Sequence, residues 1–179
     1  MGSGDGQFLD PAGLAVDASG HVFVTDQTTD RVQKFDSDGT FILAWGSMGF
    51  GNGQFMGAVA VAVNAAGDVF VADQDNFRVQ KFDNNGTFLT AWGGNGGGDG
   101  AFRYPNGVAV TPSGHILVTD TNNDRIEEFD ANGTFLTSFG HYGTALGEFE
   151  GPRHLATDVS GDVCLADEGV GRIQKFACP

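Results

Sequence analysis

Apolar and polar residues alternate along short segments of the chain, and each segment ends at a cluster of Gly, Asn or Asp. In the first quarter, "HVFVTD" (21–26) and "RVQKFD" (31–36) alternate in this way, and "GLAVD" and "TFILAWG" flank them. A period of two, β-branched and aromatic residues, and turn residues at the ends are typical of β-strands joined by hairpins. The first unit therefore predicts four short strands, separated by the turns "ASG", "QTTD" and "SDG".

This pattern returns along the whole chain with a constant spacing of 47 residues and without insertion. The spacing is kept by Phe8, Phe55, Phe102 and Phe149, by Asp26, Asp73, Asp120 and Asp167, and by Arg31, Arg78, Arg125 and Arg172. Both faces of the strands are largely apolar, so each sheet must be covered on both sides. Four-stranded units of this length that pack face to face around an axis are propeller blades.

The repeats predict an all-β fold, a β-propeller array that forms a single domain over residues 1–179. The blades are expected at approximately 4–46, 51–93, 98–140 and 145–179. The first three units close with "TFILAWG", "TFLTAWG" and "TFLTSFG", whereas the fourth runs to "RIQKFACP". The fourth blade is therefore expected to lack its outermost strand.

The segment "PAGLAVDASGHVFVTDQTTDRVQKFDSDGTFILAWG" resembles an NHL repeat, with its P-x-G-[VL]-A-V-[DN] and N-x-R-[VI]-Q-K-F-[DN] stretches. The second unit departs from it, with "MGAVAVAVN" in place of "DPAGLAVD". The resemblance covers nearly the whole chain and implies a β-propeller; the family is mostly six-bladed, so ring closure by four blades is left open. It also implies a binding platform for proteins or, in some members, RNA, while a minority are lyases or lactone hydrolases with a metal in the channel. The fold by itself does not choose among these activities.

The chain is strongly acidic, with a net charge of −14 and nine Lys and Arg residues. Because nucleic acids and anionic membranes attract cationic surfaces, neither is expected as a partner. "MGSGDGQF" has none of the features of a secretion signal, so localisation stays unknown, with a secreted or cell-surface site slightly favoured. "DSDG", "DNNG" and "DANG" lack the full calcium-loop spacing and are interpreted as hairpin turns. Asn85 and Asn132, in "NGT" segments that fit a glycosylation acceptor, are interpreted in the same way.

Several recurring residues are predicted to be structural. Asp26 and Arg31, with their three copies, are expected to form an ion pair across each hairpin. The outer-strand residues Trp45, Trp92 and Phe139 are expected to pack between blades. Cys164 takes the place of Phe23 in the repeat and is expected to be buried opposite Lys175, whereas Cys178 is expected to be an exposed thiol too distant for a disulfide.

A cluster of residues breaks the repeat pattern where the first strands enter the propeller. These residues are Arg103, Tyr104, His141, Tyr142, Arg153 and His154. They are the candidate ligand site, expected at the channel mouth beside the third and fourth blades; the alternative is ordinary variation of surface residues. The arginines and His154 suit an anionic group. A carboxylate and histidine site for Ca or Zn stays an alternative, but a three-histidine zinc site does not fit, because His21 and His115 belong to the opposite end. No nucleophile motif and therefore no catalytic residue is assigned.

The last predicted strand leaves an open edge formed by Arg172, Ile173, Gln174, Lys175 and Phe176. Unpaired N–H and C=O groups on such an edge invite another chain to add a strand. The main hypothesis is a non-enzymatic binding or scaffold module for protein–protein interaction or self-assembly, including a homo-oligomer formed through this edge. The first alternative is a metal-dependent lyase or hydrolase of the NHL type. The second is a designed or excised repeat array without a ligand.

Overall fold

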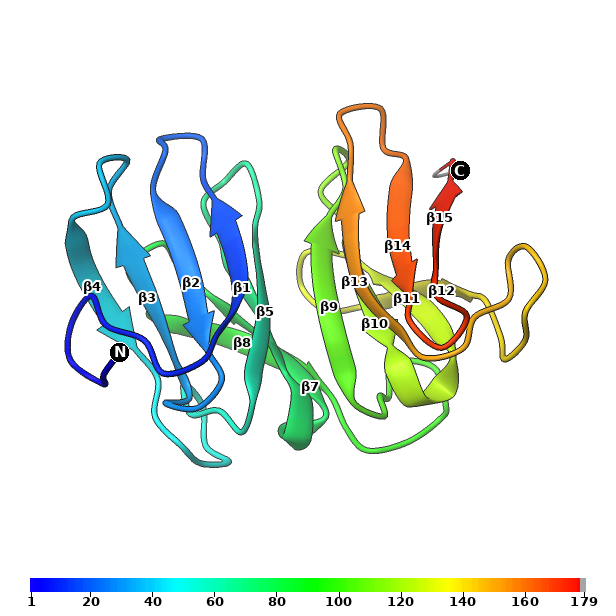
Figure 1. The fold of residues 1–179 in the computed structure, drawn as a ribbon, viewed down its shortest axis with the longest axis horizontal. Coiled ribbons are helices and arrows are strands. Elements are labelled where there is room, and N and C mark those ends of the chain that lie inside the picture. Colours follow the sequence, from blue (N-terminus) through cyan, green and yellow to red (C-terminus); the bar gives the residue numbers. More distant parts are fainter. Residues whose placement is uncertain (178–179) are drawn as a thin grey trace.

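The computed structural model describes residues 1–177, and these residues fold into four consecutive antiparallel sheets (Figure 1). Blade 1 contains β1 (Pro11–Val16), β2 (Val22–Asp26), β3 (Arg31–Phe35) and β4 (Phe41–Trp45). Blade 2 contains β5 (Ala58–Val63), β6 (Val69–Asp73), β7 (Arg78–Phe82) and β8 (Phe88–Gly93). Blade 3 contains β9 (Pro105–Val110), β10 (Ile116–Asp120), β11 (Arg125–Phe129) and β12 (Phe135–Phe139). Blade 4 contains β13 (Pro152–Thr157), β14 (Val163–Asp167) and β15 (Arg172–Phe176).

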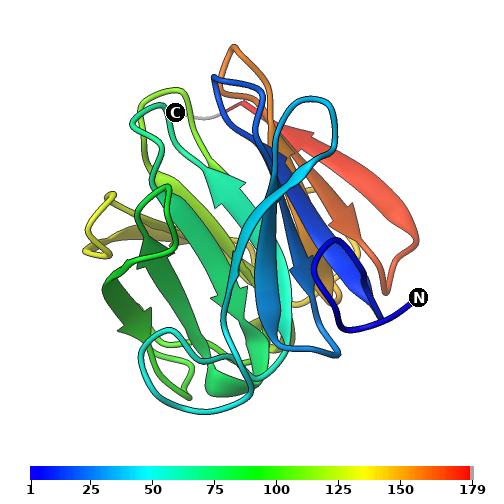
Figure 2. The same cartoon turned by 90° about the vertical axis from the view of Figure 1, so that its left-hand side faces the viewer.

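The blades stand side by side around a common axis, as the two views show (Figures 1 and 2). Their first strands are innermost: β1 packs against β5, β5 against β9, and β9 against β13. Each sheet is a meander in which every strand pairs with the next one along the chain. Two short 3₁₀ turns, Gln74–Asn76 and Thr121–Asn123, join the middle strands of blades 2 and 3. The predicted β-propeller array, with a three-stranded fourth blade, is confirmed.

The first hairpin of each blade is closed by one polar side chain at the end of the inner strand. Asp17, Asn64 and Asp158 each accept two backbone N–H groups from the turn that follows, and the Thr111 hydroxyl accepts one. A short side chain that accepts backbone N–H groups two and four residues on holds a tight turn in place. The turn chemistry that the sequence indicated thus fixes where each inner strand ends.

Each interface between blades joins the forward face of one blade, which faces the next blade, to the backward face of that next blade. Between blades 1 and 2, Phe23 and Val32 of the forward face pack in one buried cluster with Val69, Val71 and Phe82 of the backward face. The ring centroids of Trp45 and Phe82 lie 5.7 Å apart across the same interface, and those of Trp92 and Phe129 lie 5.8 Å apart across the next. The predicted packing role of the outer-strand aromatic residues is confirmed.

The turn before each outer strand covers the tryptophan of the preceding blade. Gly86 and Gly133 both have positive φ angles, and a Cβ added to them would approach Trp45 and Trp92 to 2.7 and 2.5 Å. Only a residue without a side chain allows this approach. In blade 1, which no other blade precedes within residues 1–177, the equivalent Gly39 has no neighbour within 4 Å.

The predicted Asp–Arg ion pair is present in three blades, and the prediction is wrong for the first. Arg Nε lies 2.7 to 2.9 Å from the carboxylate in the pairs Arg78–Asp73, Arg125–Asp120 and Arg172–Asp167. In blade 1, the carboxylate of Asp26 instead accepts the backbone N–H groups of both Leu9 and Asp10, each at 3.0 Å. The Arg31 guanidinium donates to carbonyl oxygens of the connection before β1.

The prediction that Cys164 is buried is also wrong, because the structure leaves this residue exposed. Its register was predicted correctly, since Cys164 pairs with Lys175. The equivalent Phe23, Phe70 and Leu117 are buried by the blade that follows each of them. Cys164 lies on the forward face of blade 4, which no other blade covers in residues 1–177. Cys178 lies outside the described residues.

Candidate functional site

The edge of β15 is the place where the repeat pattern of hydrogen bonding stops. In the first three blades the third strand pairs with a fourth, and the register places Phe35 opposite Phe41, Phe82 opposite Phe88 and Phe129 opposite Phe135. Within residues 1–177, β15 pairs with β14 alone. Its outer edge therefore presents unpaired backbone groups over Arg172–Phe176. These are the residues that the sequence predicted as the assembly edge.

An apolar cavity of about 340 Å³ lies beside this edge, between blades 3 and 4. Its wall contains Leu117, Glu128, Thr137, Phe139, Val163 and Phe176. The Phe176 ring forms one side and makes edge-on contacts with Phe139 and Phe149, at centroid distances of 6.0 and 5.6 Å. The cavity is therefore built by rings that are already fixed in place by their neighbours.

The same position is filled in the complete blades. Between blades 2 and 3, Phe135 of the outer strand lies edge-on to Phe129 at 5.9 Å, and the turn at Gly133 covers Trp92. Between blades 1 and 2, Phe88 lies on Phe82 at 6.0 Å. The cavity beside β15 is thus the space that an outer strand with an aromatic residue occupies in the other blades.

The six predicted ligand-site residues lie in several separate contacts. Tyr104 has a positive φ and packs edge-on against Phe77 at 5.4 Å, across the interface of blades 2 and 3. Arg153 is ion-paired with Glu168, and His141 Nε2 lies 3.5 Å from Glu148 in an exposed connection. Arg103 and Tyr142 are exposed. A ligand site shared by these six residues therefore stays a prediction. Tyr104 has a packing role, and the aromatic residue at Phe77 was the sequence signal for it.

His154 lines a small axial cavity of about 220 Å³. All four inner strands contribute to its wall, including Gly13, Ala60 and Gly107. The residues that β1, β5 and β9 contribute to the wall are apolar or glycine. His154 is therefore the member of the predicted cluster that reaches the propeller axis.

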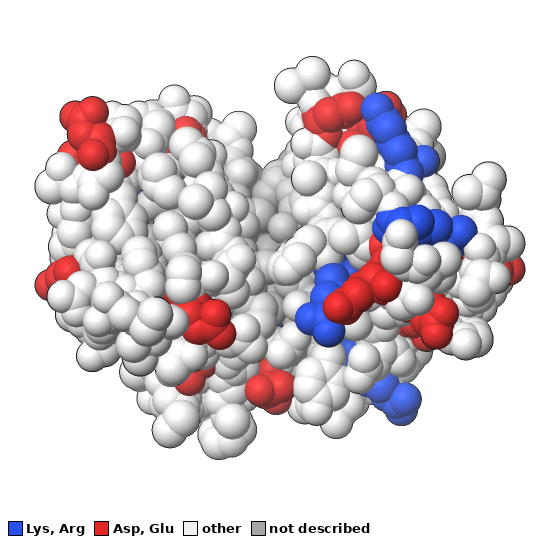
Figure 3. Space-filling view, in the orientation of Figure 1, with Lys and Arg blue, Asp and Glu red and all other residues white. Residues whose placement is uncertain are grey.

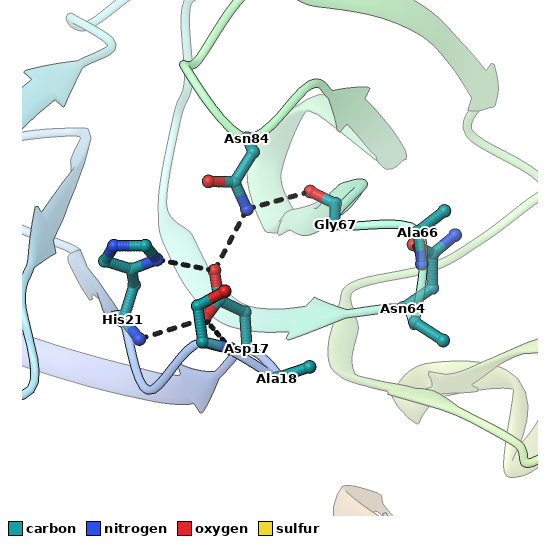
Figure 4. A pocket seen from close by; sticks show the side chains of 9 residues that line it. Asp17, Ala18, His21, Asn64, Ala66, Gly67 and Asn84 are labelled. Carbon is teal, nitrogen blue, oxygen red and sulfur yellow. Dashed lines mark hydrogen bonds and ion pairs between the residues drawn. The ribbon is translucent and has the colours of Figure 1, made fainter.

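A second polar cavity, of about 250 Å³, lies between the first turns of blades 1 and 2 (Figure 4). Its polar side chains bind one another: Asp17 Oδ2 lies 2.9 Å from His21 Nδ1 and accepts the Asn84 amide at 3.1 Å. Although burial opposes the shift, these hydrogen bonds lower the pKa of Asp17 to about 2. Asn84 also donates to the carbonyl of Gly67. The polar groups here hold two blades together.

The charge on the face shown in Figure 3 is uneven. Lys and Arg gather over the half that contains β13–β15, while the half that contains β1–β4 shows acidic and uncharged atoms. Among the described residues, no group of three or more His, Cys, Asp or Glu is arranged to hold a metal ion. The same residues contain no helix of the length and hydropathy that crossing a membrane requires.

The sequence predicted the open edge but missed the cavity beside it. The signal was present, because the repeat has no copy of Gly86 and Phe88 after Phe176 within the described chain. The cavity could be inferred only after the structure showed that Gly86 covers Trp45 and that Phe88 packs against the buried cluster between blades 1 and 2.

Known proteins show which fold family carries these features. The model of the family described as NHL repeat matches residues 8–35, 55–82 and 102–129. A stretch of 41 residues is 54% identical to Protein lin-41 of Caenorhabditis elegans and makes up 23% of this chain and 4% of that protein. The chain thus spans a small part of the curated relative that it matches.

Two solved structures show the same architecture. A streptogramin B lyase matches with a TM-score of 0.70 and 16% identity, over 100% of this chain and 57% of the lyase chain. A chain of a nidogen/laminin complex matches with a TM-score of 0.68 and 23% identity, over 93% of this chain and 60% of its own length. Likeness at this identity shows the fold alone. The three family matches lie at the repeat spacing, and the sheets follow one another as antiparallel blades. The chain is therefore an NHL-repeat β-propeller.

Proposed function

We propose that this propeller is a non-enzymatic binding module that takes up an extended segment of a partner protein along the edge of β15. One observation supports this proposal: the open edge of β15 lies beside an apolar cavity. In the complete blades, an aromatic ring of the outer strand fills the position of this cavity. Backbone hydrogen bonds along the edge supply affinity, and a side-chain pocket supplies specificity, as in other cases of strand addition.

The registers of the complete blades define the chemistry of the segment. Its backbone runs antiparallel to β15, and an aromatic residue stands opposite Phe176, as Phe88 stands opposite Phe82. Four residues later, a second aromatic residue stands opposite Ile173, as Trp92 stands opposite Val79. The ring opposite Phe176 enters the 340 Å³ cavity. The segment thus resembles residues 84–93 of this chain, "NNGTFLTAWG".

We assign the segment to another protein because the outer strands within residues 1–177 are already paired. β4, β8 and β12 pair with β3, β7 and β11 in their own blades. Donating one of them to a second copy would leave an equal edge open behind it. A partner with a free extended segment has no such cost.

The test is the binding of a synthetic peptide with the sequence of residues 84–93, measured by fluorescence anisotropy. Burying a phenylalanine ring stabilises a complex by about 1.5–3 kcal/mol. A peptide with Phe88→Ser should therefore bind at least about tenfold more weakly. In the propeller, Thr137 is exposed and lines the cavity, so the ring introduced by Thr137→Trp should block the cavity. This substitution should weaken peptide binding by a similar factor.

The matched control is Thr90→Trp, which makes the same change at the equivalent position of the complete blade 2 and should leave binding unchanged. Equal affinity for the two peptides, or equal affinity of Thr137→Trp and Thr90→Trp propellers for the first peptide, contradicts the proposal.

A further inference from the structure

The two ends of the row of blades carry apolar faces that no blade covers in residues 1–177. The first is the backward face of blade 1, where the side chains of Leu14 and Val16 are 65% and 56% exposed. The second is the forward face of blade 4, where Ile173 is 70% exposed and Cys164 is also exposed. Exposed apolar residues that form a contiguous face mark interaction surfaces.

These two faces match the two sides of an interface that the chain already makes three times. The equivalents of Leu14 in blades 2 and 3, Val61 and Val108, are 5% and 6% exposed. The equivalents of Ile173 in the other three blades are fully buried, namely Val32, Val79 and Ile126. The forward face of blade 4 and the backward face of blade 1 therefore carry the same apolar positions that form a buried core wherever a forward face packs against a backward face.

A polar contact is repeated at two of these three interfaces, whereas blade 3 has Glu128 at the lysine position. Lys34 Nζ donates to the carbonyl of Asn84 at 3.2 Å, and Lys81 Nζ donates to the carbonyl of Ala131 at 3.0 Å. The equivalent of these lysines in blade 4 is Lys175, which is half-exposed and forms ion pairs with Asp158 and Asp162 of its own blade, at 3.2 and 2.7 Å.

The acceptor that would face Lys175 is present on blade 1. Ser37 occupies the position of Asn84 and Ala131, and it lies in a turn between Asp36 and Asp38. A cation on one terminal face thus meets an acidic turn on the other. Charge complementarity of this kind sets the orientation of docking partners.

We propose that two copies of this chain dock head to tail, with the forward face of blade 4 of one copy on the backward face of blade 1 of the other. This contact goes beyond the proposed function, because it uses the broad faces of the terminal blades and not the edge of β15. It is heterologous, so each copy keeps one free face, and the assembly continues into a ring or a filament.

The test uses two variants that each remove one face. Leu14→Asp places a charge on the backward face of blade 1, and Ile173→Asp places a charge on the forward face of blade 4. Both positions are more than half exposed, so folding should be preserved. The matched control is Leu89→Asp, at a half-exposed position on the outer strand of blade 2. Mass is measured by sedimentation over a concentration series.

The wild-type chain and Leu89→Asp are expected to self-associate with rising concentration. Each face variant alone should self-associate at least about tenfold more weakly, whereas an equimolar mixture of the two should form a one-to-one dimer, because each supplies the face that the other lacks. A wild-type chain that stays monomeric, a face variant that assembles like the wild type, or a mixture that stays monomeric overturns the proposal.

The outcome is independent of the proposed function. Leu14→Asp leaves β15 and its cavity unchanged, so this variant should bind the 84–93 peptide like the wild type. Loss of assembly with retained peptide binding, and the reverse, are therefore distinguishable results.

Discussion

Glu127 Oε1 lies 2.5 Å from Arg125 Nη2, and the Glu127 side chain is fully buried. The other three blades have glutamine at this position, namely Gln33, Gln80 and Gln174. Gln80 donates to the Gln54 carbonyl at 2.6 Å and to Asp73 at 3.0 Å. An ionised glutamate has no proton to donate to the equivalent acceptors.

We predict that Glu127→Gln stabilises the protein at neutral and higher pH. Burial raises the pKa of Glu127 from 4.5 to about 7, even though Arg125 acts in the opposite sense. Between these values the folded chain holds a proton that the unfolded chain has released, so the contribution of Glu127 is greatest below about pH 4.5 and is lost as the pH rises through 7.

The loss is on the order of 3 kcal/mol, and the glutamine variant should not show it. Urea unfolding at a series of pH values measures the difference. The reverse change, Gln80→Glu, should introduce the same pH dependence into blade 2. Parallel stability curves for the wild type and Glu127→Gln between pH 5 and 8, where about 3 kcal/mol is expected to disappear, would refute this account of the buried carboxylate.

The glycines before the outer strands give a second prediction. Gly133→Ala should cost about 1–2 kcal/mol for its positive φ and a further 1–3 kcal/mol for the clash with Trp92. Gly39→Ala should cost only the first of these, because its φ is similar and nothing lies within 4 Å. Thermal or urea unfolding of the pair isolates the packing contribution. Equal destabilisation by the two substitutions would show that this turn does not hold adjacent blades together.

Cys164 provides a third prediction through its reactivity. In a Cys178→Ser background and at low protein concentration, Cys164 should react with a thiol reagent in the native state, because its side chain is exposed. In a second protein, Leu117→Cys places a thiol at the equivalent position of blade 3, with Cys164→Ser and Cys178→Ser removing the others. Leu117 is 1% exposed, so its thiol should react at least about tenfold more slowly. Similar rates would contradict an uncovered forward face on blade 4.

The sequence was sufficient to predict the strands and their order into blades, because apolar alternation and turn residues repeat at a fixed spacing. Counting residues across the hairpin at Gly169 and Val170 also predicted the register of Cys164 against Lys175. The burial of Cys164 was mispredicted because burial depends on the next blade and not on the residue's own repeat. Equivalent residues have equal environments only where both neighbours are present.

The candidate site was less predictable for the same physical reason. The open edge could be read from a missing segment, since pairing between adjacent strands is local. The cavity depends on which side chains meet across two blades, as Phe139 and Phe176 do. In blade 1, Asp26 accepts the backbone N–H of Asp10 in addition to that of Leu9, and Arg31 donates to the carbonyl oxygens of Gly4 and Gln7. The local sequence does not predict this change of partner.

Hydrogen exchange of the backbone amides tests the central claim, that β15 is an open edge that accepts a strand. The exchange of residues 172–176 is compared with and without saturating 84–93 peptide. The equivalent residues 31–35, 78–82 and 125–129, which already pair on both sides, are the internal controls. The account predicts that the peptide slows exchange in 172–176 and leaves the three control segments unchanged. Unchanged exchange in 172–176 at saturation, or protection confined to other strands, would contradict it.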